Sequence, residues 1–326
     1  MSPVLQSAVE HYRAEQRITA AGLIAARRRR FDTLDALVRT VAGFQVLAAR
    51  ESARAFPAML EEQGIDSAGE GTVSPTALAG TASDGRELRG LLDYARDDEV
   101  TPTAFDLIVT TQLQDVARQT AAIALGARPQ VEGYVRILNP PSCSRCAVLA
   151  GKWFRRNQGF DRHPKCDCRH VPASEDTADD LRSNPRAYFD SLPTATDLSE
   201  QYPDLTVKMR QELGIYSQED VFTKAGADVI RRGADIGQVV NARAGMSTSQ
   251  PILRGAGERN TARGRAAKVD VFGRQMFTTT EGMTKRGQAF RARSRNYVRL
   301  MPESILEIAE SDAEVLRLLK AHGYIT

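Results

Sequence analysis

All four cysteines of this 326-residue chain lie in one short stretch that begins at Cys143 and ends at Cys168. Cys143 and Cys146 form a C-x2-C pair, and Cys166 and Cys168 form a C-x-C pair with His163 three residues before it. Cysteines gathered in this way indicate one local site, because a disulfide framework distributes its cysteines along the chain. This stretch therefore constrains the fold more than any other feature.

The cysteine spacing is typical of a structural zinc site. A tight turn brings the first two thiolates to one side of a tetrahedral ion, and the second pair closes the shell. We expect Cys143, Cys146 and Cys166 to be ligands. The fourth ligand is either Cys168 or His163, since Cys166 and Cys168 would point to opposite faces of a regular strand. The alternative is four reduced thiols, or local disulfides in an oxidising environment.

An enzymatic interpretation of the same residues is weaker. A cysteine and a histidine can form a nucleophile and base pair, but no Asp or Asn can be assigned to orient the histidine. The sequence also contains no H-E-x-x-H helix, P-loop, G-x-S-x-G elbow or dinucleotide fingerprint. We therefore expect that the protein is not an enzyme.

Residues 1–130 are predicted to form an N-terminal helical domain. Residues 64–85 are rich in Gly, Ser, Thr and Pro and predict an irregular connection. Thr101 followed by Pro102 predicts a helix start, and Gly126 the end of that helix. An earlier helix is indicated by apolar residues at three- and four-residue steps, namely Phe31, Leu34, Leu37, Val38, Val41, Phe44 and Leu47.

Residues 131–173 are predicted to form a Cys/His zinc-binding insert with short strands. The strand candidates are residues 134–138, 152–154 and 169–171, which are rich in β-branched and aromatic residues. The expected fold is mainly α with a small β, zinc-stapled insert, and α+β overall.

The remaining chain separates into two regions of opposite charge. Residues 174–214 are predicted to be an acidic connection, and residues 215–326 a C-terminal helical region. Ser217 predicts one helix start there, and Met301 a long last helix that ends before Gly323. Residues 254–299 carry twelve Lys or Arg against three acidic residues, a net charge of +9. Because residues 245–299 contain many glycines and few large apolar residues, we expect a loop or extended arm there.

This basic arm suits contact with phosphate groups or with an acidic protein surface. It has few aromatic residues for base stacking, so DNA binding through it would be neutral to sequence and strongly dependent on salt. The candidate contact residues are Arg263, Arg265, Lys268, Arg274, Lys285, Arg286, Arg291, Arg293 and Arg295.

The sequence predicts no contact with a membrane. Mean hydropathy is −0.36, and no apolar run reaches the 18 residues that a membrane-spanning helix needs. The first residues lack a hydrophobic segment of the secretory type, so we expect a protein made in a reducing cytoplasm.

The segments 135–146, 151–154 and 162–170, which include the H-P-x-C-x-C phrase, resemble the minor head proteins of actinobacteriophages. These proteins belong to the phage Mu F-like head morphogenesis group. Residues 221–246, 278–287 and 299–309 are also similar to that phage set. The resemblance covers most of the chain beyond about residue 70.

The resemblance implies a structural minor capsid protein of a tailed-phage head. Such a protein sits inside the head near the portal in multiple copies, after assembly in the host cytoplasm. Its partners are the portal protein, the major capsid protein and, through phosphate contacts, packaged DNA. It assists head assembly, genome packaging or ejection. The alternatives are a cytoplasmic zinc-containing nucleic-acid-binding protein and, third, a capsid maturation protease, a label that some relatives carry.

Overall fold

The structure is a computed structural model that describes residues 5–69, 73–156, 169–173, 183–243, 267–271, 274–279 and 299–325. It divides into two compact units. Unit 1 comprises Met1–Asn139, Ala150–Phe160 and Asp167–Ser183, and unit 2 comprises Pro140–Leu149, Asp161–Cys166 and Asn184–Thr326. The predicted ligands His163, Cys166 and Cys168 lie outside the described residues.

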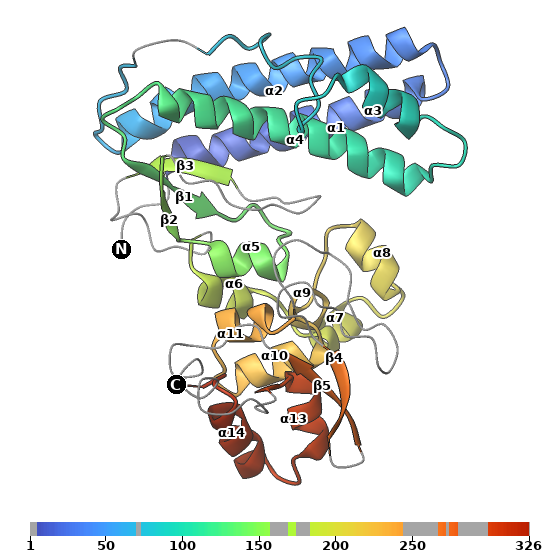
Figure 1. Cartoon of the computed structure of the whole chain (residues 1–326), viewed down its shortest axis with the longest axis vertical. Helices are drawn as coiled ribbons and strands as arrows, with labels where there is room; N and C mark the ends of the chain where they lie inside the picture. Colours follow the sequence, from blue (N-terminus) through green and yellow to red (C-terminus); the bar gives the residue numbers. More distant parts are fainter. Residues whose placement is uncertain are drawn as a thin grey trace. The chain divides into compact units, whose positions relative to one another are not determined.

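Unit 1 begins with a bundle of helices (Figure 1). Its helices are α1 (Gln6–Arg29), α2 (Leu34–Glu62), the short α3 (Leu88–Ala95) and α4 (Pro102–Gly126). The sequence explains where two of these helices begin. The Thr33 hydroxyl accepts from the backbone N–H of Ala36 at the start of α2, and the Thr101 hydroxyl accepts from the backbone N–H of Ala104 at the start of α4. Such caps satisfy backbone donors that have no partner inside the helix. The helical prediction for this region is confirmed, but Phe31 lies in the turn before α2 and, like Leu47, is exposed, so the prediction of these two residues in the apolar stripe is wrong.

The bundle is held together by apolar side chains from all four helices. Leu37 and Val41 of α2 are fully buried with Leu92 of α3 and with Phe105 and Leu113 of α4. At the same level α1 contributes Gly22, where a Cβ would lie only 2.6 Å from Leu113 Cδ1. A glycine at this point lets α1 approach α4 closely.

A three-stranded antiparallel sheet completes unit 1. Its order is β2 (Trp153–Arg155), β1 (Gly133–Ile137), β3 (Arg169–Ala173), so the three predicted strands are confirmed. One face packs on α1 and α2 through Val135, Ile137, Val171 and Ala173. A Cβ at Gly133 would meet the Phe154 carbonyl and the Trp153 ring at 2.3 and 2.5 Å, so β2 lies too close for any side chain at this position.

A buried ionic cluster joins this sheet to α1. Arg169 of β3 donates to the Glu15 carboxylate, and both side chains are almost fully buried. His11 lies one turn before Glu15, with 3.4 Å from its Nε2 to Glu15 Oε1 and 3.4 Å from its Nδ1 to Glu51 Oε1. Burial raises the pKa of Glu15, but Arg169, His11 and Arg118 together lower that pKa below its usual value.

Unit 2 consists mainly of short helices, most of them started by a polar side chain. Thr194 with Asp197, and Ser217 with Asp220, form reciprocal capping boxes. Asn184, Asp235 and Ser311 also accept from backbone N–H groups of the helices they begin. The helices are α5 (Ser144–Leu149), α6 (Pro185–Ser191), α7 (Ala195–Gln201), α8 (Val207–Glu212), α9 (Gln218–Phe222), α10 (Lys224–Arg231), α11 (Ile236–Asn241), α13 (Pro302–Ile308) and α14 (Asp312–Ala321).

Part of the basic region is strand, which corrects the expectation of a loop or extended arm over residues 245–299. Strands β4 (Ala267–Val271), β5 (Arg274–Thr279) and β6 (Arg299–Leu300) form an antiparallel sheet in that order. The last helix is also divided, because Ser311 starts α14 after α13 has ended at Ile308. The sequence signals for these strands were the alternating Val269 and Val271 in β4 and the apolar Met276 in β5. The neighbouring glycines and arginines made these signals hard to recognise.

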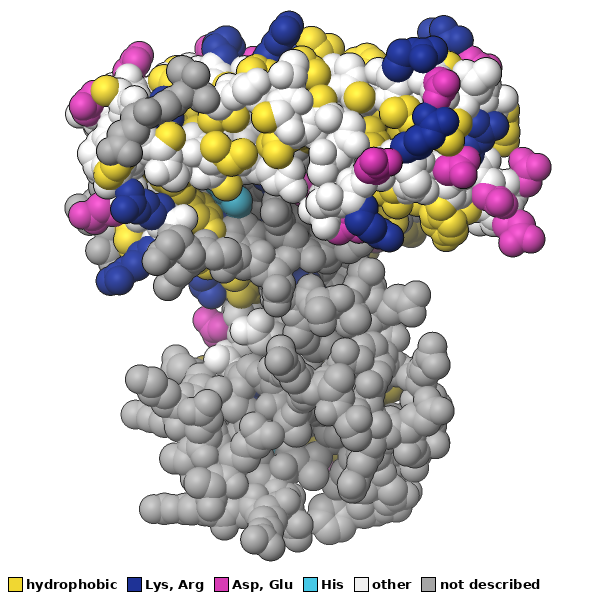
Figure 2. Space-filling view, turned by 45° about the horizontal axis from the view of Figure 1, so that its top comes forward, with side chains coloured by type: hydrophobic (Ala, Val, Ile, Leu, Met, Phe, Trp, Pro, Cys, Tyr) yellow, Lys and Arg dark blue, Asp and Glu magenta, His cyan; other side chains and the backbone are white. Residues whose placement is uncertain are grey.

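The fold is therefore mainly α with a small β component, as predicted; the zinc staple itself stays a prediction. Within the described ranges, no helix is long and apolar enough to cross a membrane. Figure 2 shows one face of the bundle, where most charged side chains gather toward the ends and the middle is mainly hydrophobic or uncharged. Exposed apolar residues such as Ile24, Leu47 and Ile123 are common on protein surfaces and indicate no site by themselves.

Candidate metal centre

The first predicted cysteine pair lies on a turn that leads into α5. The chain passes Pro140 and Pro141, reaches Cys143, and begins the helix at Ser144. The Cys143 carbonyl accepts the backbone N–H of Ala147 at 3.0 Å. Cys143 therefore takes the position of a helix cap, where a side chain can accept from the first turn.

The two thiols of this pair come from one turn, as the C-x2-C spacing predicts. The backbone N–H of Cys146 donates to Cys143 Sγ at 3.4 Å. Cys146 is buried, whereas Cys143 is partly exposed. A backbone donor directed at a thiol stabilises its thiolate, which is the form that binds metal. The donor chemistry of these two residues fits a zinc ion.

A buried tyrosine fixes the residue before the turn. The Tyr188 hydroxyl of α6 donates to the Ser142 carbonyl at 2.7 Å and accepts from the Ser142 N–H at 3.0 Å. Tyr188 is itself fully buried. One side chain therefore satisfies both backbone groups of Ser142, next to Cys143. The sequence carries no signal of this contact, because the two residues are 46 positions apart.

Between the cysteines lies a cation. Burial lowers the pKa of Arg145, while the nearby Cys143 and Cys146 oppose that shift. A guanidinium beside two thiols also favours their deprotonated forms. The turn thus offers two thiols, a backbone donor and a nearby positive charge.

The strand register of the unit 1 sheet relates the chain segment that carries the first cysteine pair to the one that carries the second. Ile137 of β1 pairs with Arg169 of β3. The chain that leaves β1 toward Cys143 and the chain that reaches β3 from Cys168 therefore meet the sheet at the same end. His170, the weakest ligand candidate by sequence, packs its ring against Tyr134 with 4.4 Å between centroids.

Two of the nine predicted basic contact residues fall in described strands. Lys268 lies in β4 and pairs in register with Phe277, and Arg274 begins β5 opposite Val271. Thr279 pairs with Arg299, so the two positions that bracket residues 280–298 lie side by side. The other candidates lie outside the described residues, namely Arg263, Arg265, Lys285, Arg286, Arg291, Arg293 and Arg295.

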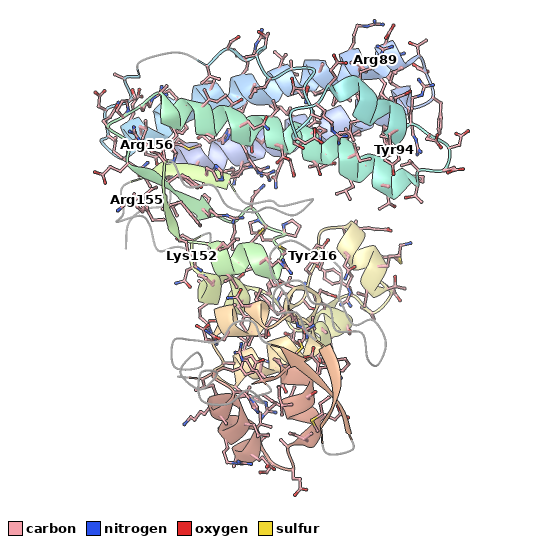
Figure 3. The ribbon with its side chains drawn as sticks, in the orientation of Figure 1. Arg89, Tyr94, Lys152, Arg155, Arg156 and Tyr216 are labelled. Atoms are coloured by element: carbon pink, nitrogen blue, oxygen red, sulfur yellow. The ribbon has the colours of Figure 1, made fainter. Side chains whose placement is uncertain are left out.

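Sequence reasoning did not single out a second group of cations. Lys152, Arg155 and Arg156 are exposed on and beside β2, an edge strand of the unit 1 sheet (Figure 3). The sequence signal for this group was the Arg-Arg pair that follows Trp153-Phe154. That these cations lie at a sheet edge could be recognised only once the position of β2 in the sheet was known. Charged side chains on an edge strand discourage pairing with other sheets.

Comparison with known proteins gives one match. A family described as VG15 protein matches residues 5–195, which is more than half of the chain. No curated protein and no solved structure is similar enough to count as a match. The matched range contains the bundle of unit 1, its sheet and the Cys143–Cys146 turn. The chain therefore belongs to the VG15 family of phage-encoded (viral gene) proteins.

Proposed function

We propose that this protein is a structural minor capsid protein of a tailed bacteriophage, placed inside the head near the portal. It contacts the portal and major capsid proteins in multiple copies and assists head assembly, genome packaging or ejection. The VG15 family match over residues 5–195 supports a phage-encoded protein. The observation that carries the capsid role is the resemblance of its Cys/His segments to Mu F-like head morphogenesis proteins.

The proposed zinc site would be a staple for the fold. Cys143 and Cys146 would hold the ion from the turn before α5, with Cys166 and either Cys168 or His163 completing the shell. A bound zinc ion supplies cross-linking between distant parts of a small insert that lacks a large core. Support comes from the Cys146 N–H donated to Cys143 Sγ and from the sheet register that brings both chain segments to one end.

The capsid role is tested on purified phage particles. Quantitative mass spectrometry should find this chain in the particle, at a constant ratio to the portal protein. Localised density in the assembled head should place it beside the portal on the inner side. A particle that lacks the chain, with the protein found only in the infected-cell lysate, would contradict the proposal.

The staple is tested by the metal content of the purified protein. We expect about one zinc ion per chain in the wild type and in Ser144→Ala, a matched control inside the same turn. Cys143→Ser should lose the zinc and lower the Tm. Wild-type protein purified without chelator that contains no zinc would remove the staple from the proposal and leave the capsid role intact.

DNA contact through the basic arm 254–299 is tested by its dependence on salt. Duplexes of unrelated sequence should bind with equal affinity. That affinity should fall steeply between 50 and 200 mM salt, by about tenfold for every two phosphate contacts. An affinity that depends on sequence would favour the nucleic-acid-binding alternative. Cleavage of a capsid precursor that disappears in Cys146→Ala would favour the protease.

A further inference from the structure

Helix α8 exposes several apolar residues and buries one arginine, although its Lys208 and Glu212 are exposed as in an ordinary surface helix. Val207 and Met209 are 49% and 45% exposed, and Leu213, which ends the helix, is 66% exposed. Arg210 in contrast is only 4% exposed. A surface helix of a globular protein normally buries its apolar residues and exposes its arginines.

The buried Arg210 side chain lacks acceptors among the described residues. Its Nε and Nη1 are fully enclosed, and neither atom donates a hydrogen bond to the part of the chain that the structure describes. Two other buried arginines have acceptors. Arg30 donates through Nη2 to the Asp97 and Val100 carbonyls, although its Nε has no partner among the described residues, and Arg128 donates to the Ser67 and Ala124 carbonyls. An enclosed guanidinium without acceptors is costly, because it has lost its hydration and gained nothing in exchange.

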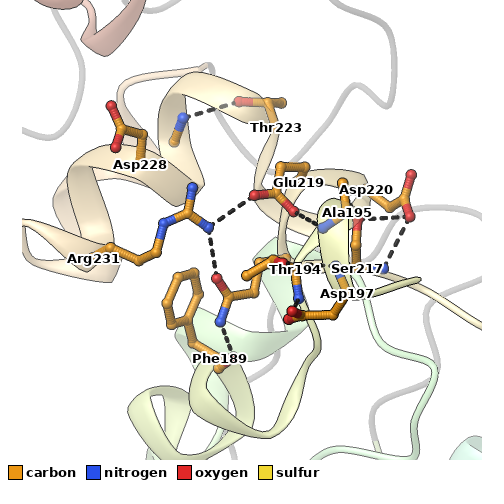
Figure 4. A network of polar contacts seen from close by, with 12 residues as sticks. Phe189, Thr194, Ala195, Asp197, Ser217, Glu219, Asp220, Thr223, Asp228 and Arg231 are labelled. Atoms are coloured by element: carbon orange, nitrogen blue, oxygen red, sulfur yellow. Dashed lines mark hydrogen bonds and ion pairs between the residues drawn. The ribbon is translucent and has the colours of Figure 1, made fainter. Parts of the chain in front are cut away.

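Three carboxylates of the flanking helices α7 and α9 are already engaged in other contacts (Figure 4). Asp197 accepts the Thr194 N–H in the capping box of α7, and Asp220 accepts from Ser217 in that of α9. Glu219 accepts from Arg231 and from the Ala195 N–H. A carboxylate for Arg210 is therefore not at hand among these groups.

The apolar residues around Arg210 point to the kind of partner that would supply one. We propose that the α8 surface, formed by the exposed Val207, Met209 and Leu213 together with the enclosed Arg210 of the same helix, docks an acidic, partly apolar segment of another virion protein. The partner's apolar side chains cover Val207, Met209 and Leu213, and its carboxylate accepts from Arg210. A charged contact enclosed by apolar residues is the arrangement found at the energetic centres of interfaces. That the partner is a virion protein rests on the proposed function.

Access to Arg210 is consistent with how α8 is held. It is a six-residue helix that starts at the Thr206 cap and ends before Gly214, which has φ of +76°. Among the described elements, none packs extensively against α8. Docking therefore requires a local movement of α8 that exposes the guanidinium, and few contacts with other described elements oppose such a movement.

The stability of the free protein gives the first test. Arg210→Met replaces the guanidinium by an apolar side chain of similar length, and we expect the Tm to rise or stay unchanged. Arg128→Met is the matched control, and it should lower the Tm because it leaves the Ser67 and Ala124 carbonyls without their donor. An Arg210→Met protein that melts several degrees below wild type would show that the guanidinium is satisfied internally and would overturn the proposal.

The amount of protein in assembled particles gives the second test. Met209→Ser combined with Leu213→Ser alters only exposed side chains, so folding measured by circular dichroism should be unchanged. Copies per particle should fall at least tenfold in this double variant and in Arg210→Met. Leu316→Ser on α14, also exposed, is the control and should be incorporated like wild type.

The remaining outcomes separate the two proposals. Wild-type incorporation of the double variant would overturn the α8 surface and leave the capsid role standing. Absence of the wild-type chain from particles would overturn the capsid role and with it the partner named here. Self-association of purified wild type by light scattering, lost in the double variant, would identify a second copy as the occupant and overturn the choice of another virion protein.

Discussion

The two units of this protein are held together in different ways. Unit 1 is built on long helices that share an apolar core and enclose an ionic cluster, with Glu15, Arg118 and Arg169 all buried. Unit 2 is built on helices of five to ten residues, most of them started by a side-chain cap. Short helices gain little from their own hydrogen bonds, so local caps and tertiary contacts decide whether they form.

The difference extends to how charge is used. Unit 1 contains buried charges that are paired with each other, as in Arg169 with Glu15 and Arg118 with Asp115 at 2.8 Å, besides Arg30 and Arg128, which donate to backbone carbonyls. In unit 2 the buried Arg299 donates to the His322 carbonyl at 2.9 Å and lies over the Tyr324 ring at 4.1 Å. Unit 1 should therefore respond most to loss of a charged partner, and unit 2 to loss of neutral acceptors and caps.

The largest effect is expected in unit 1. Glu15→Ala removes the carboxylate that Arg169 and His11 contact and leaves a buried guanidinium without its charge partner. Removing one member of a buried ion pair costs about 3–5 kcal/mol, and we expect the free energy of unfolding to fall by that amount. Urea denaturation followed by Trp153 fluorescence measures it, since Trp153 is the single tryptophan and lies in β2.

Two further variants decide what the loss at Glu15 means. Glu15→Leu combined with Arg169→Met removes both charges and should recover most of the stability. Arg29→Ala, at the end of the same helix α1, breaks an exposed pair with Asp32 in the turn that follows and should change the free energy of unfolding by no more than about 0.5 kcal/mol. Equal losses in Glu15→Ala and Arg29→Ala would contradict the special role of the buried cluster.

The second prediction separates the units by pH. His322 of unit 2 accepts from the Leu300 N–H at 3.3 Å through Nδ1, and burial together with the nearby Arg299 lowers its pKa from 6.5 to about 4. The unfolded chain therefore binds more protons between these values, so the stabilisation is complete above pH 6.5 and is lost as the pH falls toward 4. We expect a loss of about 2 kcal/mol after allowance for solvent screening.

In unit 1 the corresponding loss comes at lower pH. The pKa of Glu15 is lowered in the folded state, so its contribution is present above the usual carboxyl range and disappears only as the pH falls through the folded-state value. On acidification, far-UV circular dichroism should change before Trp153 fluorescence does. His322→Asn should delay the first change, and simultaneous changes in both signals at every pH would contradict the separation of the units.

The sequence predicted the first unit well for a physical reason. Long helices repeat their apolar pattern several times, and Thr101-Pro102 and Gly126 mark the ends of α4 as expected. The pattern fails where elements are short. One helix was expected from Ser217 to Ile230, yet the chain breaks at Thr223, whose φ is +69°. A local break of this kind has no signature in the periodicity of apolar residues.

The candidate sites were predictable to different degrees. The C-x2-C turn follows from spacing, because only local geometry is involved. The Tyr188 contact with Ser142 and the burial of Arg210 do not follow from spacing, since each depends on chain segments brought together by the fold. Arg210 looks like an ordinary surface residue of a polar segment until its exposure is known.

The third prediction compares caps in the two units. Ser217→Ala removes the hydroxyl that accepts from Asp220 N at 3.1 Å and donates to Asp220 Oδ2 at 2.8 Å. We expect a loss of about 1 kcal/mol, because the five-residue α9 has few other stabilising bonds. Thr33→Ala removes the equivalent cap of the 29-residue α2 and should cost less, because that helix is held by the core. Larger losses for Thr33→Ala in thermal melts would reverse the contrast between the units.

The smallest effect is expected for the exposed pair of α8. Lys208 Nζ lies 3.9 Å from Glu212 Oε1, and both side chains are largely exposed. Lys208→Ala should change the free energy of unfolding by no more than about 0.5 kcal/mol, because solvent screens such pairs. The same change leaves Met209, Arg210 and Leu213 in place, so particle incorporation should equal wild type. A Lys208→Ala protein that folds normally and fails to enter particles would contradict this expectation. It would show that the partner contacts α8 through the charge of Lys208 and not through an acceptor for Arg210.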